Sequence, residues 1–362
     1  MNSCGKVIHV VRQLHYGGVE KQVATILKNR DLSAFDHEVV CITDGSDTLR
    51  ELQQSGASVY VIRAQSSIPS PITIFKLYRY FRKVRPLVVH TRGAEANFHG
   101  AIAALLAKVN AVVCEEIGFP NHSKKARCVF RWIYGRANVV ISVSRAVRDY
   151  IVSIGEASQK KIAVLYNPVN DPSARANLDF SEGLKIGFVG RLEPVKNPVN
   201  LLKGVAKAIE SGIPCSCKVV GDGSQMGELR KLIQVLGIEA HVKLLGYKEK
   251  PFLDLTDCNL YIQPSRSEGF GIAIVEAMYA GLPVIATGVG GVTEFLKHDH
   301  NGFILDDTSS DGIFKSIVNF WNSEEAARRR VASDAYVYAI NNFGIKSYFE
   351  NCDKIYGSLL LH

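Results

Sequence analysis

The sequence lacks the patterns that would assign it to several common classes of protein. Its eight cysteines include no Cys-x-x-Cys pair, so neither a zinc ribbon nor a redox dithiol is indicated. No apolar run approaches the roughly 20 residues that cross a bilayer, and the N-terminus shows no signal-peptide pattern. Several of the scattered cysteines lie in apolar segments, as buried free thiols do, so we expect a reducing cytoplasm.

The charge of the chain is unevenly distributed. The 362 residues suffice for two domains of ordinary size, and 47% apolar with 22% charged residues is typical of a globular protein. Residues 1–168 contain 23 Lys and Arg against 12 Asp and Glu, whereas residues 169–362 contain 20 against 23. The basic first half predicts an anionic partner, which could be a nucleic acid, a membrane surface or an acidic substrate. The absence of RRM, KH, helix-turn-helix and zinc-finger patterns disfavours nucleic acid.

Short, continuous apolar runs alternate with helix-like segments along the whole chain. Such runs indicate parallel sheets that are covered on both faces, and two successive sets predict an α/β protein with two doubly wound domains. We expect the domains at residues 1–168 and 184–346, a polar linker at 169–183, and a terminal helix at 347–361. The expected strands are 7–11, 38–42, 59–62, 87–90, 111–114, 139–143, 184–189, 215–220, 241–245, 260–263, 284–286 and 302–305.

Two glutamates in the second half flank a glycine turn between a strand and a helix. Glu268 lies in the turn, and Glu276 lies eight positions later, within a run of helical apolar spacing. A helix start offers backbone N–H groups and a positive dipole end to a phosphate, while carboxylates accept hydrogen bonds from sugar hydroxyls. A glycine-rich turn is also common in α/β proteins, and Glu276 could be a solvated helix residue. The residues expected at a phosphorylated-sugar pocket are Glu268, Gly269, Phe270, Gly271, Ile272 and Glu276.

Two cations follow an earlier strand that ends at Gly190. Arg191 and Lys196 lie in the loop that leads to the next helix, and a pair of cations at the carboxyl end of a strand suits a diphosphate. Ordinary surface charge is the plain alternative for either residue alone. The next strand runs into a turn at Gly221, where glycine permits a close approach of backbone and ligand, although a simple turn explains it equally well.

The stretch from residue 267 to 286 resembles the donor-binding signature of the group 1 glycosyltransferases, a retaining family with the GT-B fold. The resemblance extends over most of the chain and is strongest from 186 to 305. It implies two Rossmann-like domains facing a cleft, with the first on the acceptor side and the terminal helix packing back on it. It also implies Glu268 beside the donor sugar, Glu276 on the nucleotide ribose, and both Arg191 and Lys196 on the diphosphate. Gly190 and Gly221 would lie by the donor.

The first half departs from the family pattern. A loop after the first strand contains Gly17, Gly18 and Glu20. This loop lacks the Gly-x-Gly-x-x-Gly spacing of a dinucleotide site. The resemblance implies that it lies near the diphosphate of the donor and near the acceptor. At the strand end where many members have a histidine beside the donor sugar, this chain has Ile117. The remaining polar candidates are Glu115 and Glu116, of which we favour Glu116 as a catalytic group. His90, Glu20 and Glu115 are further acceptor-side candidates.

Two basic segments rich in aromatic residues, 76–85 and 124–132, lie in the first half. Such segments can lie on anionic lipid, and a solvated helix face is about equally expected of either alone. We therefore expect a peripheral protein of the inner membrane face.

The resemblance implies transfer of a hexosyl group from a nucleotide diphosphate sugar, with a UDP-sugar favoured, to a hydroxyl of a glycan. That glycan would be lipid-linked, in the synthesis of a cell-surface polysaccharide, lipopolysaccharide or glycolipid. No cofactor is expected, and the absence of any Asp-x-Asp predicts no metal. The alternatives are an epimerase or hydrolase of sugar nucleotides on the same fold, and a non-catalytic membrane or nucleic-acid binding module.

Overall fold

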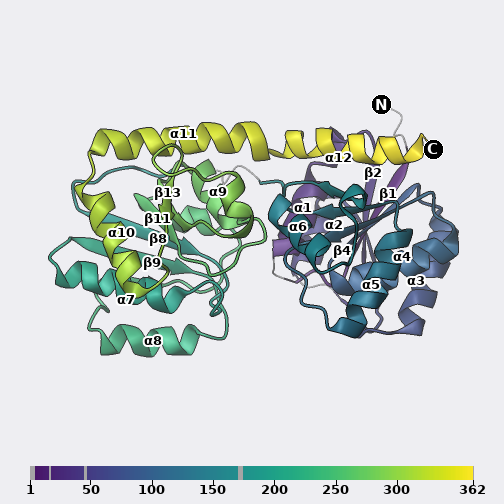
Figure 1. The fold of residues 1–362 in the computed structure, drawn as a ribbon, viewed down its shortest axis with the longest axis horizontal. Coiled ribbons are helices and arrows are strands. Elements are labelled where there is room, and N and C mark those ends of the chain that lie inside the picture. Colours follow the sequence, from purple (N-terminus) through teal and green to yellow (C-terminus); the bar gives the residue numbers. More distant parts are fainter. Residues whose placement is uncertain (1–4, 16–17, 45–46, 170–173, 362) are drawn as a thin grey trace. The chain divides into compact units, whose positions relative to one another are not determined.

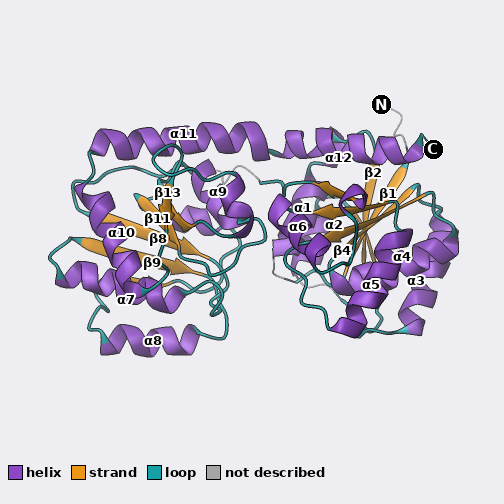
Figure 2. Ribbon diagram, viewed as in Figure 1, coloured by secondary structure: helices purple, strands orange, loops and turns teal. Residues whose placement is uncertain are grey.

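The computed structural model describes residues 5–15, 18–44, 47–169 and 174–361. The chain forms two compact units, Met1–Val169 together with Ile345–His362, and Asn170–Gly344 (Figure 1). In each unit a central sheet lies between layers of helices, as the strand and helix colours of Figure 2 show. The cleft expected between two such domains stays a prediction.

The sheet of the first unit is entirely parallel, with the strand order β3-β2-β1-β4-β5-β6-β7. This order reverses direction between β1 and β4, which is the mark of a doubly wound sheet. The short strand β7 was not expected from the sequence. The strands are β1 (Lys6–Val11), β2 (Asp36–Cys41), β3 (Ser58–Val61), β4 (Val88–Arg92), β5 (Ala111–Glu116), β6 (Val139–Ser142) and β7 (Ile162–Val164).

Helices cover both faces of this sheet. Apolar residues of α3, α4 and α5 form one core cluster with the strands, and those of α12 form another. Tyr348, Phe349 and Tyr356 of α12 are buried against β1, β4 and β5, so the end of the chain belongs to the first unit. The helices are α1 (Gly18–Lys28), α2 (Asp47–Gln54), α3 (Pro71–Val84), α4 (Ala94–Ala107), α5 (Lys124–Arg136), α6 (Arg145–Ser153) and α12 (Ile345–Leu360).

The second unit repeats this design with the parallel strand order β10-β9-β8-β11-β12-β13. Its strands are β8 (Leu184–Val189), β9 (Cys215–Val220), β10 (Val242–Leu244), β11 (Leu260–Gln263), β12 (Val284–Thr287) and β13 (Phe303–Leu305). Its helices are α7 (Pro198–Glu210), α8 (Met226–Val235), α9 (Ile272–Tyr279), α10 (Ser310–Asn322) and α11 (Glu325–Phe343).

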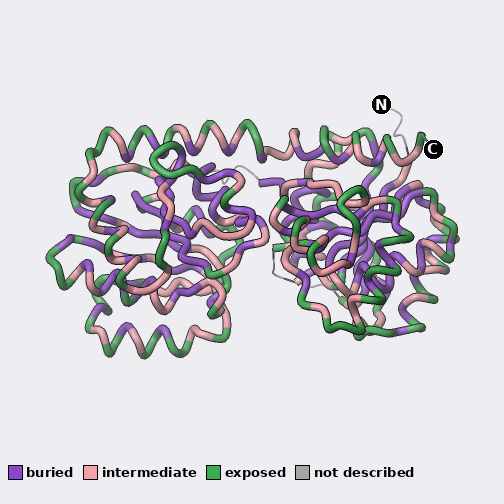
Figure 3. The backbone as a smooth tube through the Cα atoms, in the orientation of Figure 1, coloured by how far each residue is buried: buried purple, intermediate pink, exposed green. Residues whose placement is uncertain are grey.

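Every strand expected from the sequence is present, and the prediction of two doubly wound parallel sheets is confirmed. The strands are largely buried while the helices alternate between buried and exposed faces (Figure 3), which is why the strands read as continuous apolar runs. Part of the segment 169–183, which was expected to be a linker, packs on the second unit. Phe180 is buried in the core of the second unit, and Asn177 N–H donates to the Thr256 carbonyl, so the end of this segment packs on that unit.

Candidate active site

Two loops of the second unit meet where its strand order reverses, between β8 and β11. Ligands of open α/β sheets bind at such a point, beyond the carboxyl ends of the strands. Lys196 comes from the loop after β8 and Glu268 from the loop after β11, and Lys196 Nζ lies 2.6 Å from Glu268 Oε1. The Arg266 N–H donates to the Val195 carbonyl at 2.8 Å, which joins the two loops. The fold thus brings together the cation and the carboxylate that the sequence assigned to one ligand.

Glu268 is held by a chain of buried hydrogen bonds that begins in β11. Ser265 Oγ donates to Glu268 Oε1 at 2.7 Å, and Gln263 Nε2 donates to Ser265 Oγ at 2.9 Å. Tyr261 OH in turn donates to Gln263 Oε1 at 2.6 Å. Burial raises the pKa of Tyr261 well above its ordinary value, and the Glu268 charge adds to this, so the phenol remains a donor. The carboxylate is therefore oriented before any ligand binds.

A glycine sets the start of α9 beside these loops. Gly271 is the N-cap residue with φ +99°, a left-handed conformation that side chains rarely adopt. A Cβ there would lie 3.2 Å from Ile274 Cδ1 and 3.3 Å from Val292 Cγ2, so the turn is closely packed. The first turn of α9 begins directly afterwards with Ile272, and its N–H groups and dipole provide a site for an anion.

A second glycine brings the loops after β8 and β9 together. Gly221 has φ +142°, and a Cβ at this position would lie 1.9 Å from the Gly190 carbonyl oxygen. Only glycine allows this approach, so the expected close contact at Gly221 is with protein backbone. Arg191 follows Gly190 with an exposed side chain, for which the described part of the chain provides no ion-pair partner. Glu193 accepts hydrogen bonds from Ser224 N and Oγ and so fixes the loop that presents Arg191.

The remaining residues of the expected pocket differ in what they can offer. The Phe270 ring is buried, with its centroid 5.5 Å from that of Phe295 and 5.2 Å from that of Phe343, so the side chain supports the turn. Glu276 lies in the second turn of α9 with 7% of its surface exposed. Gly269 and Ile272 are partly exposed.

In the first unit, Glu115 and Glu116 point to opposite faces of the sheet, as successive strand residues do. Glu115 Oε2 lies 2.6 Å from Arg92 Nη1 and 2.8 Å from His90 Nε2. Helix α12 completes this cluster, because Tyr348 OH accepts from Arg92 Nη2 at 2.9 Å and Tyr356 OH lies 2.7 Å from His90 Nδ1. Burial opposes ionisation, but Arg92 and His90 hold the pKa of Glu115 below its ordinary value. This cluster fastens α12 to the sheet.

Glu116 lies on the other face, against α4 and α5. Its Oε1 accepts from Asn97 Nδ2 at 3.1 Å and from the hydroxyl of Tyr134. Burial raises its pKa to about 7, so the carboxyl is partly protonated at neutral pH. Glu116 is 4% exposed and Glu115 is 2% exposed. Side chains of their own unit enclose both carboxyl groups, and the catalytic role expected of Glu116 stays a prediction.

The other first-unit candidates are also placed. His90 is fully buried, and burial and Arg92 lower its pKa to about 4, so it belongs to the α12 cluster rather than to an open site. Glu20 lies half-buried in the first turn of α1, and burial raises its pKa. Gly18 begins α1 and is exposed, whereas Gly17 lies outside the described residues.

Two further observations concern the described residues as a whole. Among them, no three His, Cys, Asp or Glu side chains gather in a group that could hold a metal ion. None of the helices within these ranges combines the length and the apolar character needed to span a bilayer.

Comparison with protein families gives two adjoining matches. Residues 16–171 match Glycosyltransferase Family 4, and residues 170–336 match Glycosyl transferases group 1. The chain belongs to the group 1 glycosyltransferases. It is accordingly a transferase. Among curated relatives it is 26% identical to the Escherichia coli UDP-Gal:alpha-D-GlcNAc-diphosphoundecaprenol alpha-1,3-galactosyltransferase, over 99% of this chain and 98% of that protein.

A second relative and a solved structure are consistent with this assignment. The Campylobacter jejuni N-acetylgalactosamine-N,N'-diacetylbacillosaminyl-diphospho-undecaprenol 4-alpha-N-acetylgalactosaminyltransferase is 23% identical, over 85% of this chain and 87% of its own length. The structure of Anabaena HepE in complex with UDP superposes with a TM-score of 0.84 at 24% identity, covering 98% of this chain and 100% of that one. The glycosyltransferase therefore has the GT-B fold, as the resemblance implied.

The sequence of this glycosyltransferase did not lead us to predict the hydrogen-bond chain that supports Glu268. One signal was available, because Tyr261 and Gln263 in the strand and Ser265 just after it place polar groups at every second position of an otherwise apolar segment. Such spacing puts Tyr261 and Gln263 on one face of the strand, with Ser265 following in the same direction. Both faces of this sheet are covered, so polar groups repeated on one face must satisfy one another or a functional residue.

Proposed function

We propose that this glycosyltransferase moves a sugar from a UDP-sugar to a hydroxyl of a lipid-linked glycan, with retention of anomeric configuration. The observation that carries the proposal is the Lys196–Glu268 pair at 2.6 Å, at the switch point of the second sheet and near the start of α9. A cation, a helix start and an oriented carboxylate suit the two ends of a diphosphate sugar.

Each residue has a distinct part in the proposed reaction. The bond from the anomeric carbon to the diphosphate would break while the bond to the acceptor oxygen forms on the same face, and the proton of the acceptor hydroxyl would pass to an oxygen of the departing diphosphate. Arg191, Lys196 and the start of α9 would stabilise the charge that develops on the departing diphosphate. Glu268 would accept hydrogen bonds from the donor sugar, and Glu276 from the ribose hydroxyls. The buried chain from Tyr261 would keep the Glu268 carboxylate aimed while the charges change.

The comparisons support the choice of donor and acceptor class. The name of the Escherichia coli relative contains a UDP-sugar donor and a diphosphoundecaprenol-linked acceptor, and the Campylobacter jejuni relative also acts on a diphospho-undecaprenol glycan. Both acceptors are lipids that carry a sugar through a diphosphate. A product of this type would serve the assembly of a cell-surface polysaccharide.

The first experiment is a thermal-shift screen of UDP-, GDP-, ADP- and dTDP-sugars on the full chain. A ligand that binds only the folded state stabilises it by about 2.7 kcal/mol at a concentration of 100 Kd. We expect UDP and at least one UDP-sugar to raise the midpoint. An unshifted midpoint with every nucleotide sugar would contradict the assignment of the donor site.

The second experiment measures consumption of the bound UDP-sugar with and without a sugar-diphosphoundecaprenol acceptor. Transfer requires that the donor is consumed mainly in the presence of the acceptor and that the anomeric configuration, read by NMR, is retained. Equal consumption without acceptor would indicate a hydrolase or an epimerase on the same fold. An inverted product would contradict the mechanism but not the donor site.

A further inference from the structure

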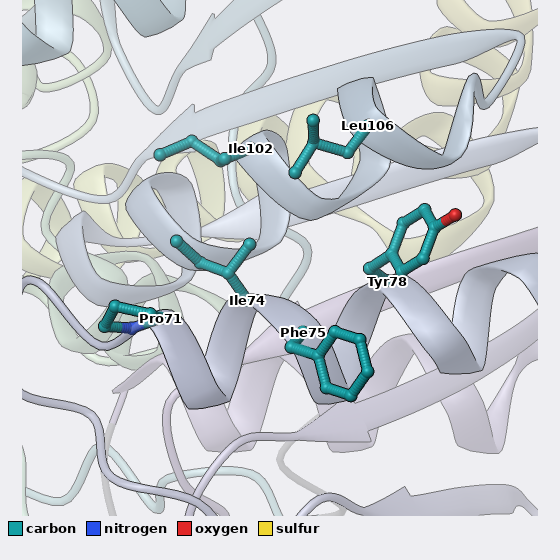
Figure 4. A pocket seen from close by; sticks show the side chains of 6 residues that line it. All are labelled: Pro71, Ile74, Phe75, Tyr78, Ile102 and Leu106. Carbon is teal, nitrogen blue, oxygen red and sulfur yellow. The ribbon is translucent and has the colours of Figure 1, made fainter.

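The first unit exposes a group of apolar side chains on α3 and α4. On α3, Ile72 is 68% exposed and Phe75 is 58% exposed, and Leu106 on α4 is 59% exposed. Exposed fractions of this size on large apolar side chains that lie together are unusual on a soluble surface and mark an interaction site. The two helices pack side by side and leave a groove of about 450 Å³ between them. Figure 4 shows its lining residues, which are Pro71, Ile74, Phe75, Tyr78, Ile102 and Leu106.

Helix α3 holds this surface in a fixed orientation. Its first turn is capped by Ser70, whose side chain accepts from the Thr73 N–H, and Pro71 begins the helix. On the inner side, Leu77 and Phe81 are buried in the core of the first unit. The exposed apolar residues therefore belong to a rigid, anchored helix, and burying them against a partner would cost little conformational entropy.

The same helix carries charge of one sign only. Lys76, Arg79, Arg82 and Lys83 are exposed, and α3 contains no acidic residue. Within the described ranges, no carboxylate lies within ion-pair distance of Arg82 or Lys83. Arg79 lies over the Phe75 ring, 6.0 Å from its centroid, so the basic and apolar surfaces adjoin directly. A partner of this face must therefore offer both anionic groups and apolar depth.

We infer that this face of α3 and α4 docks on an anionic lipid bilayer. The cations would contact the headgroups, while Ile72, Phe75 and Leu106 would enter the boundary between headgroups and acyl chains, as interfacial helices do. A second copy of the chain fits poorly, since a two-fold contact would set the cations of one α3 against those of the other. The inference adds a partner to the proposed function, because docking would bring the enzyme to acceptors held in the membrane. It does not depend on the donor site.

The test is co-sedimentation of the full chain with vesicles of phosphatidylglycerol and phosphatidylcholine, and with vesicles of phosphatidylcholine alone. We expect binding to the anionic vesicles, weakened by added salt because charges are screened beyond about 8 Å at physiological ionic strength. A triple variant, Arg79→Gln with Arg82→Gln and Lys83→Gln, should bind about 100-fold more weakly, since each cation near an anionic surface contributes about a factor of 5. A double variant, Phe75→Ser with Leu106→Ser, should also lose binding while keeping all of the charge.

Matched controls come from exposed residues of the second unit. Lys203→Gln with Arg230→Gln and Lys231→Gln removes the same charge elsewhere, and Val235→Ser removes an apolar side chain that is 82% exposed. Both controls should bind as the wild type does, and circular dichroism shows whether each variant is folded.

Three results would overturn the inference. These are absence of wild-type binding to anionic vesicles, binding by the folded triple or double variant that equals wild-type binding, and wild-type self-association that the Phe75 and Leu106 substitutions abolish. The thermal shift with UDP should be the same in the wild type and the triple variant. A failed membrane inference can thus be told apart from a failed donor site.

Discussion

Glu268→Gln should have opposite effects on ligand binding and on transfer. Glutamine keeps the size of the side chain and the oxygen that accepts from Ser265 Oγ, but it removes the charge that pairs with Lys196. In the free protein the Glu268 carboxylate pairs with Lys196, and its negative charge would also repel a diphosphate. We therefore expect UDP to bind more tightly to the variant, because Lys196 can contact the diphosphate without first breaking an ion pair with a carboxylate.

The magnitude follows from the burial of the pair. Exposed ion pairs contribute about 0.2–1 kcal/mol, whereas breaking a buried pair costs about 3–5 kcal/mol. The side chains of Lys196 and Glu268 are 19% and 8% exposed, so the pair lies between these limits. A contribution of about 2 kcal/mol corresponds to a Kd for UDP that is about 30-fold lower. Transfer should fall about 100-fold, the loss of one charged contact to the reacting sugar.

Isothermal titration calorimetry with UDP measures the first effect, and the rate of transfer at saturating donor measures the second. Glu182→Gln is the matched control, since Glu182 pairs with Lys185 at 2.6 Å near the amino end of β8, away from the site, and its loss should change neither quantity. If folded Glu268→Gln bound UDP no more tightly than the wild type, the electrostatic reasoning would be refuted. If it also transferred sugar at the wild-type rate, Glu268 would not belong to the active site.

Four further outcomes are expected. Arg191→Ala and Lys196→Ala should each lower kcat about 100-fold without unfolding the protein, and wild-type turnover in either folded variant would remove that residue from the diphosphate site. Transfer should persist in EDTA, and activity abolished by the chelator and restored by magnesium or manganese would contradict this. Burial lowers the pKa of His90 to about 4, so only the unfolded chain takes up this proton as the pH falls from about 6.5 to about 4. Over that range the wild type should lose about 1.4 kcal/mol of stability per pH unit relative to His90→Gln, and a constant difference in urea unfolding would be evidence against a buried neutral histidine. Glu115→Gln should lower the free energy of unfolding by about 3 kcal/mol, because the buried Arg92 charge loses its partner, and a change below about 1 kcal/mol would show that Arg92 is solvated.

The order of strands and helices was predictable because the pattern of each strand depends only on residues that are close together in the sequence. A strand that is covered on both faces is largely apolar, so β1 and β8 could be recognised without knowledge of their neighbours. The strand β7 was missed because its three residues, Ile162–Val164, give no pattern longer than a turn. The end of the expected linker packs on the second core through Leu178 and Phe180, and the sequence did not show this because polar residues surround these two side chains.

The position of the donor-site residues was also predictable in part. Glu268 and Gly271 sit on one continuous segment, so their spacing already places them at one strand-to-helix turn. Lys196 lies 72 positions away from Glu268, and the sequence linked the two only through the resemblance to a family. Their 2.6 Å contact exists because parallel strands β8 and β11 are neighbours in the sheet.

The sequence by itself determined which segments form strands, where the turns need glycine, and which charged side chains stand at strand ends. Those properties depend on residues close together in the chain. The tertiary structure alone decided how Glu115 and Glu116 are buried and which side chains they contact. Their surroundings come from α4, α5 and α12, which are far apart in sequence. It also decided that Tyr261 and Gln263 support Glu268, since a hydrogen bond needs atoms within about 3 Å and only folding brings them there.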